Sequence, residues 1–292
     1  MAVSRRRLIL ALSRSPGIGG RTIARILTRN DLTRIKPDKF LTLSEETLVE
    51  EYRLPARTAG KWTEAKKALI EDAAKVEDRL DRLGVSLITA ADAFYPPQVE
   101  QFDPDPPGVL FSYGNARILE AKSFAVMSSR KSPTEALEAI EGMAEEGVLG
   151  GETLITGHDT PEYQRSAIVP LRWGAPRILV LDRGLFAALG EELAEEPFRA
   201  ARLWRYRFDP QTDLAISSLH PDQDFAAQSN KARDWLIACL ASRIDFVRIA
   251  KGGNMEKLAK RALQVGRPVR VSAHWTDAAE FEKLGAKVLS SS

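Results

Sequence analysis

The chain has 292 residues, of which 44% are hydrophobic and 28% charged, a composition typical of a soluble globular protein of about two domains. Its one cysteine, Cys239, excludes an intramolecular disulfide framework and a cysteine-rich zinc site, and three widely spaced histidines disfavour a histidine-based metal site. The formal net charge is only +2, but residues 1–39 hold ten basic and two acidic side chains, so we expect a local anionic partner.

The N-terminal segment has some features of a signal peptide, but its pattern favours a helix of a cytoplasmic protein. The apolar stretch Leu8–Leu12 has five residues, and Arg14 and Pro16 follow it without a small-residue cleavage site. No apolar run approaches the roughly 18–20 residues of a membrane span. We therefore expect a cytoplasmic protein with no membrane partner.

Residues 1–89 are predicted to form a small all-α domain. Apolar residues recur there at three- and four-residue spacing, which is the helical period. Thr42 and Glu45 have the spacing of a capping box, so a helix is expected to start at Thr42. The predicted helices cover residues 4–14, 20–29, a segment that starts at 42, and 55–83.

The turn between the first two helices is rich in glycine and predicts a helix-hairpin-helix, or SAM-like, motif. The glycines allow backbone N–H groups to approach a phosphate, and the N-terminus of the following helix adds partial positive charge. The candidate residues for this secondary DNA contact are Gly17, Gly19, Gly20 and Arg21. The alternative is a glycine-rich turn that only packs the two helices together.

From residue 90 the pattern changes to an α/β fold. A proline-rich connector over 90–122 is followed by short apolar runs that alternate with helical segments, which predicts right-handed βαβ units. We expect an extended Rossmann-like, doubly wound, mostly parallel sheet over 90–292. The predicted strands are 124–127, 153–156, 178–181, 203–208, 246–250, 269–272 and 287–289, and the predicted helices are 133–147, 160–172, 185–196, 222–242, 254–265 and 276–284.

The first candidate site follows the strand at 124–127, where Ser128, Ser129, Arg130 and Lys131 precede a helix. Ligands of open α/β sheets bind beyond the carboxyl ends of strands. Short side chains at 128 and 129 allow close backbone approach, and Arg130 can bind a phosphate through two hydrogen bonds. We favour an anion site, although Ser132 could simply cap the helix.

Two further loops at strand ends contain polar residues. Gly157 is followed by His158 and Asp159, which suggests acid–base chemistry, but adjacent loop residues usually point apart and no nucleophile is identifiable beside them. We favour loop polarity and a helix cap there. Lys251, Gly252 and Gly253 precede another helix and could offer free N–H groups to an anion.

The helix predicted over 222–242 has a polar face formed by Asn230, Arg233 and Asp234, which either lines a cleft or is a solvated helix end. The chain contains no Gly-x-Gly-x-x-Gly sequence and no Gly-Lys-Ser/Thr P-loop. Chemistry with dinucleotides or nucleoside triphosphates is therefore disfavoured, and we expect neither cofactor nor metal.

Taken in chain order, these motifs resemble those of the DprA/Smf family of DNA-processing proteins. After the helix-hairpin-helix the matching segments are Tyr95-Pro96-Pro97, Asp105-Pro106-Pro107-Gly108-Val109-Leu110-Phe111, Gly114-Asn115, Ala125–Arg130, Gly157 and Ile178–Leu185. The resemblance covers nearly the whole chain. It implies a non-enzymatic protein, commonly a homodimer, that binds single-stranded DNA in a basic pocket and loads a RecA-type recombinase.

The resemblance is to a divergent member of that family. Trp235 stands where the family has the second arginine of Arg-Asn-Arg, Cys239 where it has a glycine, and Gly252-Gly253 where it has Ser-Gly. The basic pocket that the resemblance implies would be supplied by Arg130, Lys131, Arg177, Lys231, Arg233 and Lys251.

Two other functions remain open at this stage. One is a nucleotide-processing enzyme of the lysine-decarboxylase-like (LOG) type, since Lys251-Gly252-Gly253-Asn254 loosely resembles its phosphate loop and Glu256 is a candidate catalytic carboxylate. The other is a relative associated with a mobile element or with defence that senses nucleic acid or a nucleotide.

Overall fold

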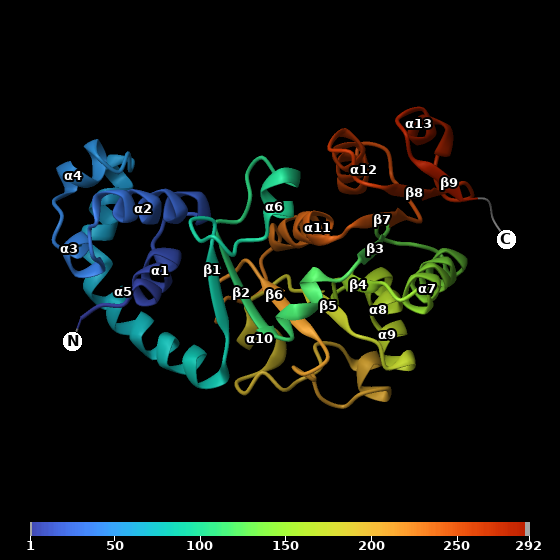
Figure 1. Ribbon diagram of the computed structural model, residues 1–292, viewed down its shortest axis with the longest axis horizontal. Coiled ribbons are helices and arrows are strands. Elements are labelled where there is room, and N and C mark those ends of the chain that lie inside the picture. The colour runs from blue at the N-terminus through green and yellow to red at the C-terminus, as the bar shows by residue number, and fades with distance from the viewer. Residues whose placement is uncertain (1, 290–292) are drawn as a thin grey trace. The chain divides into compact units, whose positions relative to one another are not determined.

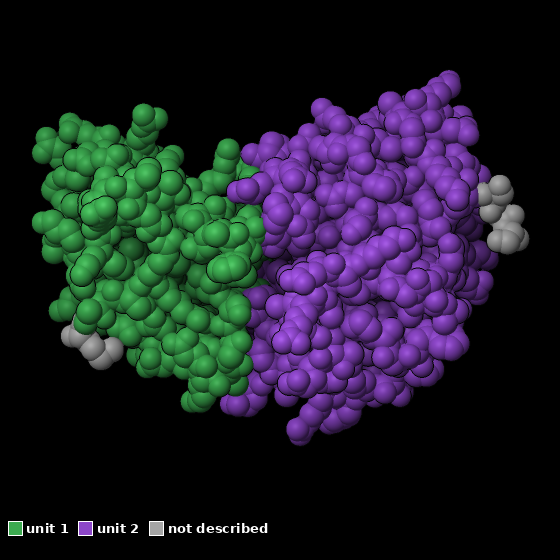
Figure 2. All heavy atoms as spheres, viewed as in Figure 1, with its two compact units in different colours: residues 1–95, 105–111, 218–221 green, residues 96–104, 112–217, 222–292 purple. Residues whose placement is uncertain are grey.

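The computed structural model describes residues 2–289, which divide into two compact units (Figure 2). The first unit comprises residues 2–95, 105–111 and 218–221, and the second comprises residues 96–104, 112–217 and 222–289. The predicted domain boundary after residue 89 stays a prediction.

The first unit is mostly helical. Its helices are α1 (Arg5–Arg14), α2 (Gly20–Thr33), α3 (Pro37–Leu41), α4 (Glu45–Glu50) and α5 (Ala56–Leu83). The Ser4 hydroxyl accepts the Arg7 N–H at the start of α1, and the apolar run Leu8–Leu12 is completely buried. Because this run packs into the core of the unit, it forms a structural helix, as its spacing predicted.

The predicted helix start at Thr42 is wrong. Thr42 instead terminates α3, and Ser44 caps α4 by accepting the N–H of Thr47 at 3.2 Å. The sequence also did not indicate the strand β1 (Ser86–Thr89), which lies next to β2 (Val109–Gly114). Along the chain, the short helix α6 (Pro97–Phe102) comes between β1 and β2.

The second unit contains a parallel sheet. Its strands are β3 (Ser123–Met127), β4 (Thr153–Thr156), β5 (Arg177–Val180), β6 (Leu214–Ser217), β7 (Arg243–Phe246), β8 (Val269–Ser272) and β9 (Lys287–Leu289). They lie in the order β6-β5-β4-β3-β7-β8-β9, and each neighbouring pair is parallel. The last residues of β2 belong to this unit and lie next to β6.

Helices cover both faces of this sheet. They are α7 (Thr134–Leu149), α8 (Pro161–Ala167), α9 (Val169–Trp173), α10 (Leu185–Leu189), α11 (Ser229–Leu240), α12 (Asn254–Gln264) and α13 (Ala278–Lys283), with 3₁₀ turns η1 (Ala116–Glu120) and η2 (Arg199–Leu203). In Figure 1, α7, α8 and α9 lie on one side of β3 and β4, and α11 lies on the other. Phe124 and Val126 of β3 pack against Ile140 and Val148 of α7. The predicted doubly wound α/β fold after a helical region is confirmed.

Two predicted strands are misplaced. Residues 203–208 contain no strand, since η2 is followed by an irregular segment with one isolated bridge between Glu195 and Arg207, and the strand β6 begins at Leu214. The strand predicted over 246–250 ends at Phe246, so the residues after it form a turn at the sheet edge. Among residues 2–289, no helix is long and apolar enough to cross a membrane.

Candidate nucleic-acid interface

The strand order of the second unit places a switch point between β3 and β7. From β3 the chain proceeds through β4, β5 and β6 in one direction, and from β7 through β8 and β9 in the other. Met127 pairs with Phe246, so both strands end at the same edge. Open α/β sheets bind ligands in the crevice at such a point. The turns that follow these two strands are therefore the candidate site.

The two turns are tied together by hydrogen bonds. The Ser129 N–H donates to the Arg248 carbonyl at 2.8 Å, and the Ala250 N–H donates to the Ser129 hydroxyl at 2.8 Å. The Arg248 guanidinium donates to the carbonyls of Arg130 and Lys131, both at 3.1 Å. These bonds hold Lys131 at a φ of 62°, a left-handed conformation that costs a non-glycine residue on the order of 1 kcal/mol.

Four cations converge on these turns: Arg130, Lys131, Arg248 and Lys251, called the rim cations below. Arg130, Lys131 and Lys251 are exposed, whereas Arg248 is half-buried. Within residues 2–289 none of the four takes part in a salt bridge. Sequence reasoning missed Arg248 because the predicted strand over 246–250 included it; only the true strand end at Phe246 identifies it as a turn residue.

The paired glycines do not offer the free N–H groups that the sequence suggested. The Gly252 N–H donates to the Glu256 carboxylate, and the Gly253 N–H donates to the Ala250 carbonyl at 3.0 Å. Hydrogen bonds from Lys260 and Gly252 lower the pKa of Glu256, which therefore stays ionised. A phosphate at the N-terminus of α12 would have to displace this carboxylate.

Ser128 and Ser129 support the first turn. The Ser128 side chain is buried, and its hydroxyl lies 3.1 Å from that of Ser132. Ser132 also donates its hydroxyl to the Ser129 carbonyl at 3.0 Å. These serines therefore shape the backbone that carries Arg130 and Lys131.

Arg233 lies beneath the two turns that carry the rim cations, which are called the rim below. Its side chain is only 2% exposed. Its guanidinium carbon lies 4.4 Å from the Tyr163 ring centroid, and its Nε donates to Asp234 at 2.8 Å. It also pairs with Asp159. Two carboxylates and an aromatic ring already contact this guanidinium. Its direct role is therefore to hold Asp159, Tyr163 and Asp234 together beneath the rim.

Gly157 is required by this stack. A Cβ at Gly157 would lie 2.7 Å from the Arg233 Nη1 and 3.0 Å from the Tyr163 Cδ2. Tyr163 in turn donates to Asp234 at 2.8 Å, and Asn254 donates to the same carboxylate at 2.9 Å. Burial raises the pKa of Tyr163, so the hydroxyl keeps the proton that it donates.

The prediction that Arg177 belongs to this site is wrong. Arg177 is the first residue of β5 and so lies at the amino edge of the sheet, opposite the rim. It is fully buried, with Nε 2.8 Å from Asp213 and Nη2 2.6 Å from Glu196. Lys231, the third residue of α11, is exposed.

His158 does not form an acid–base site with Asp159. It is buried, and its Nε2 lies 3.3 Å from Asp182 without the alignment of a hydrogen bond. Burial lowers the pKa of His158, so the ring is neutral at pH 7. No group of three or more potential metal ligands is present in the described part of the chain.

The glycine hairpin of the first unit packs against its own unit. Gly17 has a φ of 88°, and a Cβ there would lie 2.8 Å from the Thr58 hydroxyl. A Cβ at Gly20 would lie 2.4 Å from the Gly108 nitrogen, and Arg21 pairs with Asp105 at 3.0 Å. Gly19 is exposed with open space around it. This packing accounts for Gly17 and Gly20, and a DNA contact at the hairpin stays a prediction.

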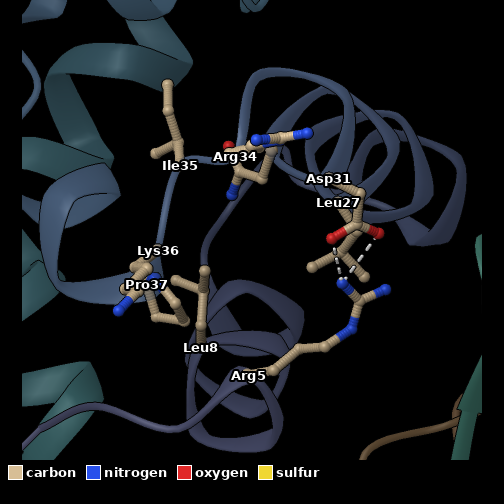
Figure 3. Close-up of a pocket in the computed structure, with 9 residues that line it drawn as sticks. Arg5, Leu8, Leu27, Asp31, Arg34, Ile35, Lys36 and Pro37 are labelled. Atoms are coloured by element: carbon tan, nitrogen blue, oxygen red, sulfur yellow. Dashed lines mark hydrogen bonds and ion pairs between the residues drawn. The ribbon is translucent and has the colours of Figure 1, made fainter.

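Five of the ten basic side chains in residues 1–39 pair with acidic residues of the first unit. A hollow of about 400 Å³ beside α1 and α2 is lined by Leu8 and Leu27, and there Arg5 pairs with Asp31 at 2.7 Å (Figure 3). Similar pairs to acidic residues of the same unit are made by Arg6, Arg7, Arg21 and Arg29. A local anionic partner for this segment stays a prediction.

Comparison with known proteins identifies the family. The model of the family "DNA recombination-mediator protein A" matches residues 86–289. The chain belongs to this family. A search of curated proteins finds no match.

Two solved structures of this family share the fold. DNA processing protein A (DprA) from Streptococcus pneumoniae matches with a TM-score of 0.72 at 17% identity, over 99% of this chain and 95% of that one. DNA processing protein A from Helicobacter pylori, studied for its single-stranded DNA binding mode, matches with a TM-score of 0.53 at 16% identity, over 70% of this chain and 90% of that one.

Proposed function

We propose that the chain binds single-stranded DNA at the rim cations and acts as a recombination mediator. The observation that carries this proposal is the pair of tied turns at the switch point, which present Arg130, Lys131 and Lys251 to solvent without a salt-bridge partner among the described residues 2–289. Such cations neutralise phosphates and release counterions. Membership of the family and the single-stranded DNA binding of the Helicobacter pylori protein support the choice of ligand.

The geometry favours binding over the enzymatic alternative. Glu256, the candidate catalytic carboxylate of a LOG-type enzyme, is engaged by Lys260 at 2.6 Å and by the Gly252 N–H. A carboxylate with a lowered pKa is a poor general acid. The residues at the rim accordingly bind and position a strand.

Family membership also supports two finer proposals. The protein would load a RecA-type recombinase onto the strand that it protects, and it would do so as a homodimer. Light scattering of the purified chain tests the dimer, and recombinase filament formation on strands coated with single-strand-binding protein tests the loading.

Anisotropy of a labelled oligothymidylate tests the central proposal. Arg130→Ala with Lys131→Ala should weaken single-stranded binding by about thirtyfold or more, since two charge-assisted contacts to phosphates are lost and each is worth roughly 1–3 kcal/mol. A matched control, Arg57→Ala with Lys61→Ala on the exposed surface of α5, should leave it unchanged. Wild-type affinity in the rim variant, or equal loss in the control, refutes the proposal, as does tighter binding to duplex DNA.

A further inference from the structure

A second surface of the α/β unit has the composition of a nucleic-acid contact. Residues 199–207, here called the aromatic–arginine segment, read Arg-Ala-Ala-Arg-Leu-Trp-Arg-Tyr-Arg and contain four arginines and no carboxylate. Its apolar side chains are unusually open: Leu203 is 87% exposed, Trp204 50% and Tyr206 76%. Nothing in the rim described above involves this segment, which appears in gold in Figure 1.

The segment is anchored so that these side chains stay outside. Arg205 points inward, where it pairs with Glu196 at 3.4 Å and with Asp213. Ala201 is fully buried, and its carbonyl accepts the N–H groups of Trp204 and Arg205, both at 2.9 Å. Arg205 thus fixes the backbone, and Arg202 pairs at the surface with Glu195 at 3.6 Å. Arg199, Arg207 and the aromatic rings face solvent.

A neighbouring helix extends the surface. Arg172 of α9 places its guanidinium carbon 5.2 Å from the Trp204 ring centroid, a cation–π contact. The next residue, Trp173, is 53% exposed. Within residues 2–289 neither Arg199 nor Arg207 has a salt-bridge partner. Arg172 also pairs with Glu141, so the available positive charge on this surface is that of Arg199 and Arg207, which lie in the same segment as the exposed rings.

We propose that the aromatic–arginine segment is a second contact for single-stranded DNA. Proteins that bind single strands without sequence preference stack bases on aromatic rings and hold phosphates with nearby cations, and arginine adds cation–π contacts. Trp204 and Tyr206 would stack bases, and Arg199 and Arg207 would contact phosphates. The segment extends the proposed function to a second surface, because it lies at the amino edge of β5 and β6, opposite the rim.

Charge also indicates the course of the strand. A hollow of about 600 Å³ lies beside Tyr206 and Arg207, and its other wall carries Glu191, Glu192 and Glu195. Carboxylates repel phosphates, so the backbone of the strand would follow the arginine side. A protein partner could also use exposed tryptophan, tyrosine and arginine, but Arg199 and Arg207, which are exposed and have no salt-bridge partner within residues 2–289, favour a polyanion.

Anisotropy of a labelled oligothymidylate separates this proposal from the rim. Trp204→Ala with Tyr206→Ala should weaken binding by about tenfold, as expected for the loss of stacking, whereas Trp204→Phe with Tyr206→Phe should retain it. Phe94→Ala removes an aromatic side chain that is 86% exposed in the first unit and should have no effect. The slope of log affinity against log salt is negative, and Arg199→Gln with Arg207→Gln should reduce its magnitude by roughly 1.4.

The outcomes for the two surfaces are distinguishable. If the alanine pair at 204 and 206 binds as tightly as wild type while the rim variant loses affinity, the second contact is overturned and the rim proposal stands. If the same pair instead changes only the oligomeric state in light scattering, the surface contacts protein and the proposal is likewise overturned. Loss in the segment variants with none in the rim variant would overturn the rim alone.

Discussion

Replacing Arg177 with methionine distinguishes a structural arginine from a DNA ligand. The side chain makes charge-assisted hydrogen bonds to Asp213 at 2.8 Å and Glu196 at 2.6 Å, and it donates to the Ala167 carbonyl at 3.1 Å. All of these groups are buried, and the two carboxylates are fully enclosed. Without Arg177, the negative charges of Glu196 and Asp213 stay buried with one positive partner fewer.

The expected cost follows from this arrangement. Removing one partner of a buried ion pair typically destabilises a protein by about 3–5 kcal/mol. Arg205 still contacts both carboxylates, so we expect the lower end, about 3 kcal/mol. Because folded domains are stable by only about 5–15 kcal/mol, the urea midpoint followed by circular dichroism should fall markedly.

A companion variant checks the cause. Adding Glu196→Gln and Asp213→Asn to Arg177→Met removes the uncompensated charges and should restore part of the lost stability. Affinity of the folded Arg177→Met protein for single-stranded DNA should match wild type. An Arg177→Met protein with an unchanged urea midpoint but lost DNA affinity would refute the reasoning and return Arg177 to the binding site.

Three further predictions follow from single contacts. Gly157→Ala should destabilise the protein by about 1–3 kcal/mol in urea unfolding, because the new Cβ would overlap Arg233; an unchanged midpoint would contradict the packing. Glu256→Ala should tighten single-stranded DNA binding at low salt, because it frees the Gly252 N–H and removes a negative charge; weaker binding would contradict this. Burial, then the positive charge of Arg14, lowers the pKa of His220 to about 4. The unfolded chain therefore binds the extra proton first, so stability should fall as pH drops from about 6.5 towards 4, by up to about 3 kcal/mol, and His220→Gln should flatten that part of the pH profile.

The position of the site could be predicted from local sequence because it depends on strand ends. The buried run at 124–127 followed by Ser128, Ser129 and Arg130 indicated a turn at the carboxyl edge of a sheet, and the structure places it there. The pairing of this turn with that of Arg248 could not be predicted. It depends on the adjacency of β3 and β7, which are separated by more than a hundred residues.

The sequence also could not show which cations remain free to bind a phosphate and which pair with carboxylates of the protein. Arg177 and Arg130 both lie near apolar runs, but Arg177 meets Glu196 and Asp213 only after the chain has folded. The strand predicted over 203–208 failed for a related reason. Its aromatic residues favour strands, yet the inward ion pairs of Arg205 anchor an irregular segment and leave its neighbours exposed.

The most direct test of the rim is the salt dependence of single-stranded DNA binding. The triple rim variant, with alanine in place of Arg130, Lys131 and Lys251, should show a shallower slope of log affinity against log salt. The magnitude of this negative slope should fall by roughly 2, since each phosphate contact contributes about 0.7. The control that removes three charges from α5, at Arg57, Lys61 and Lys67, should leave the slope as in wild type. Equal slopes for the wild type and the rim variant would contradict the account, because phosphates would then not lie at the rim.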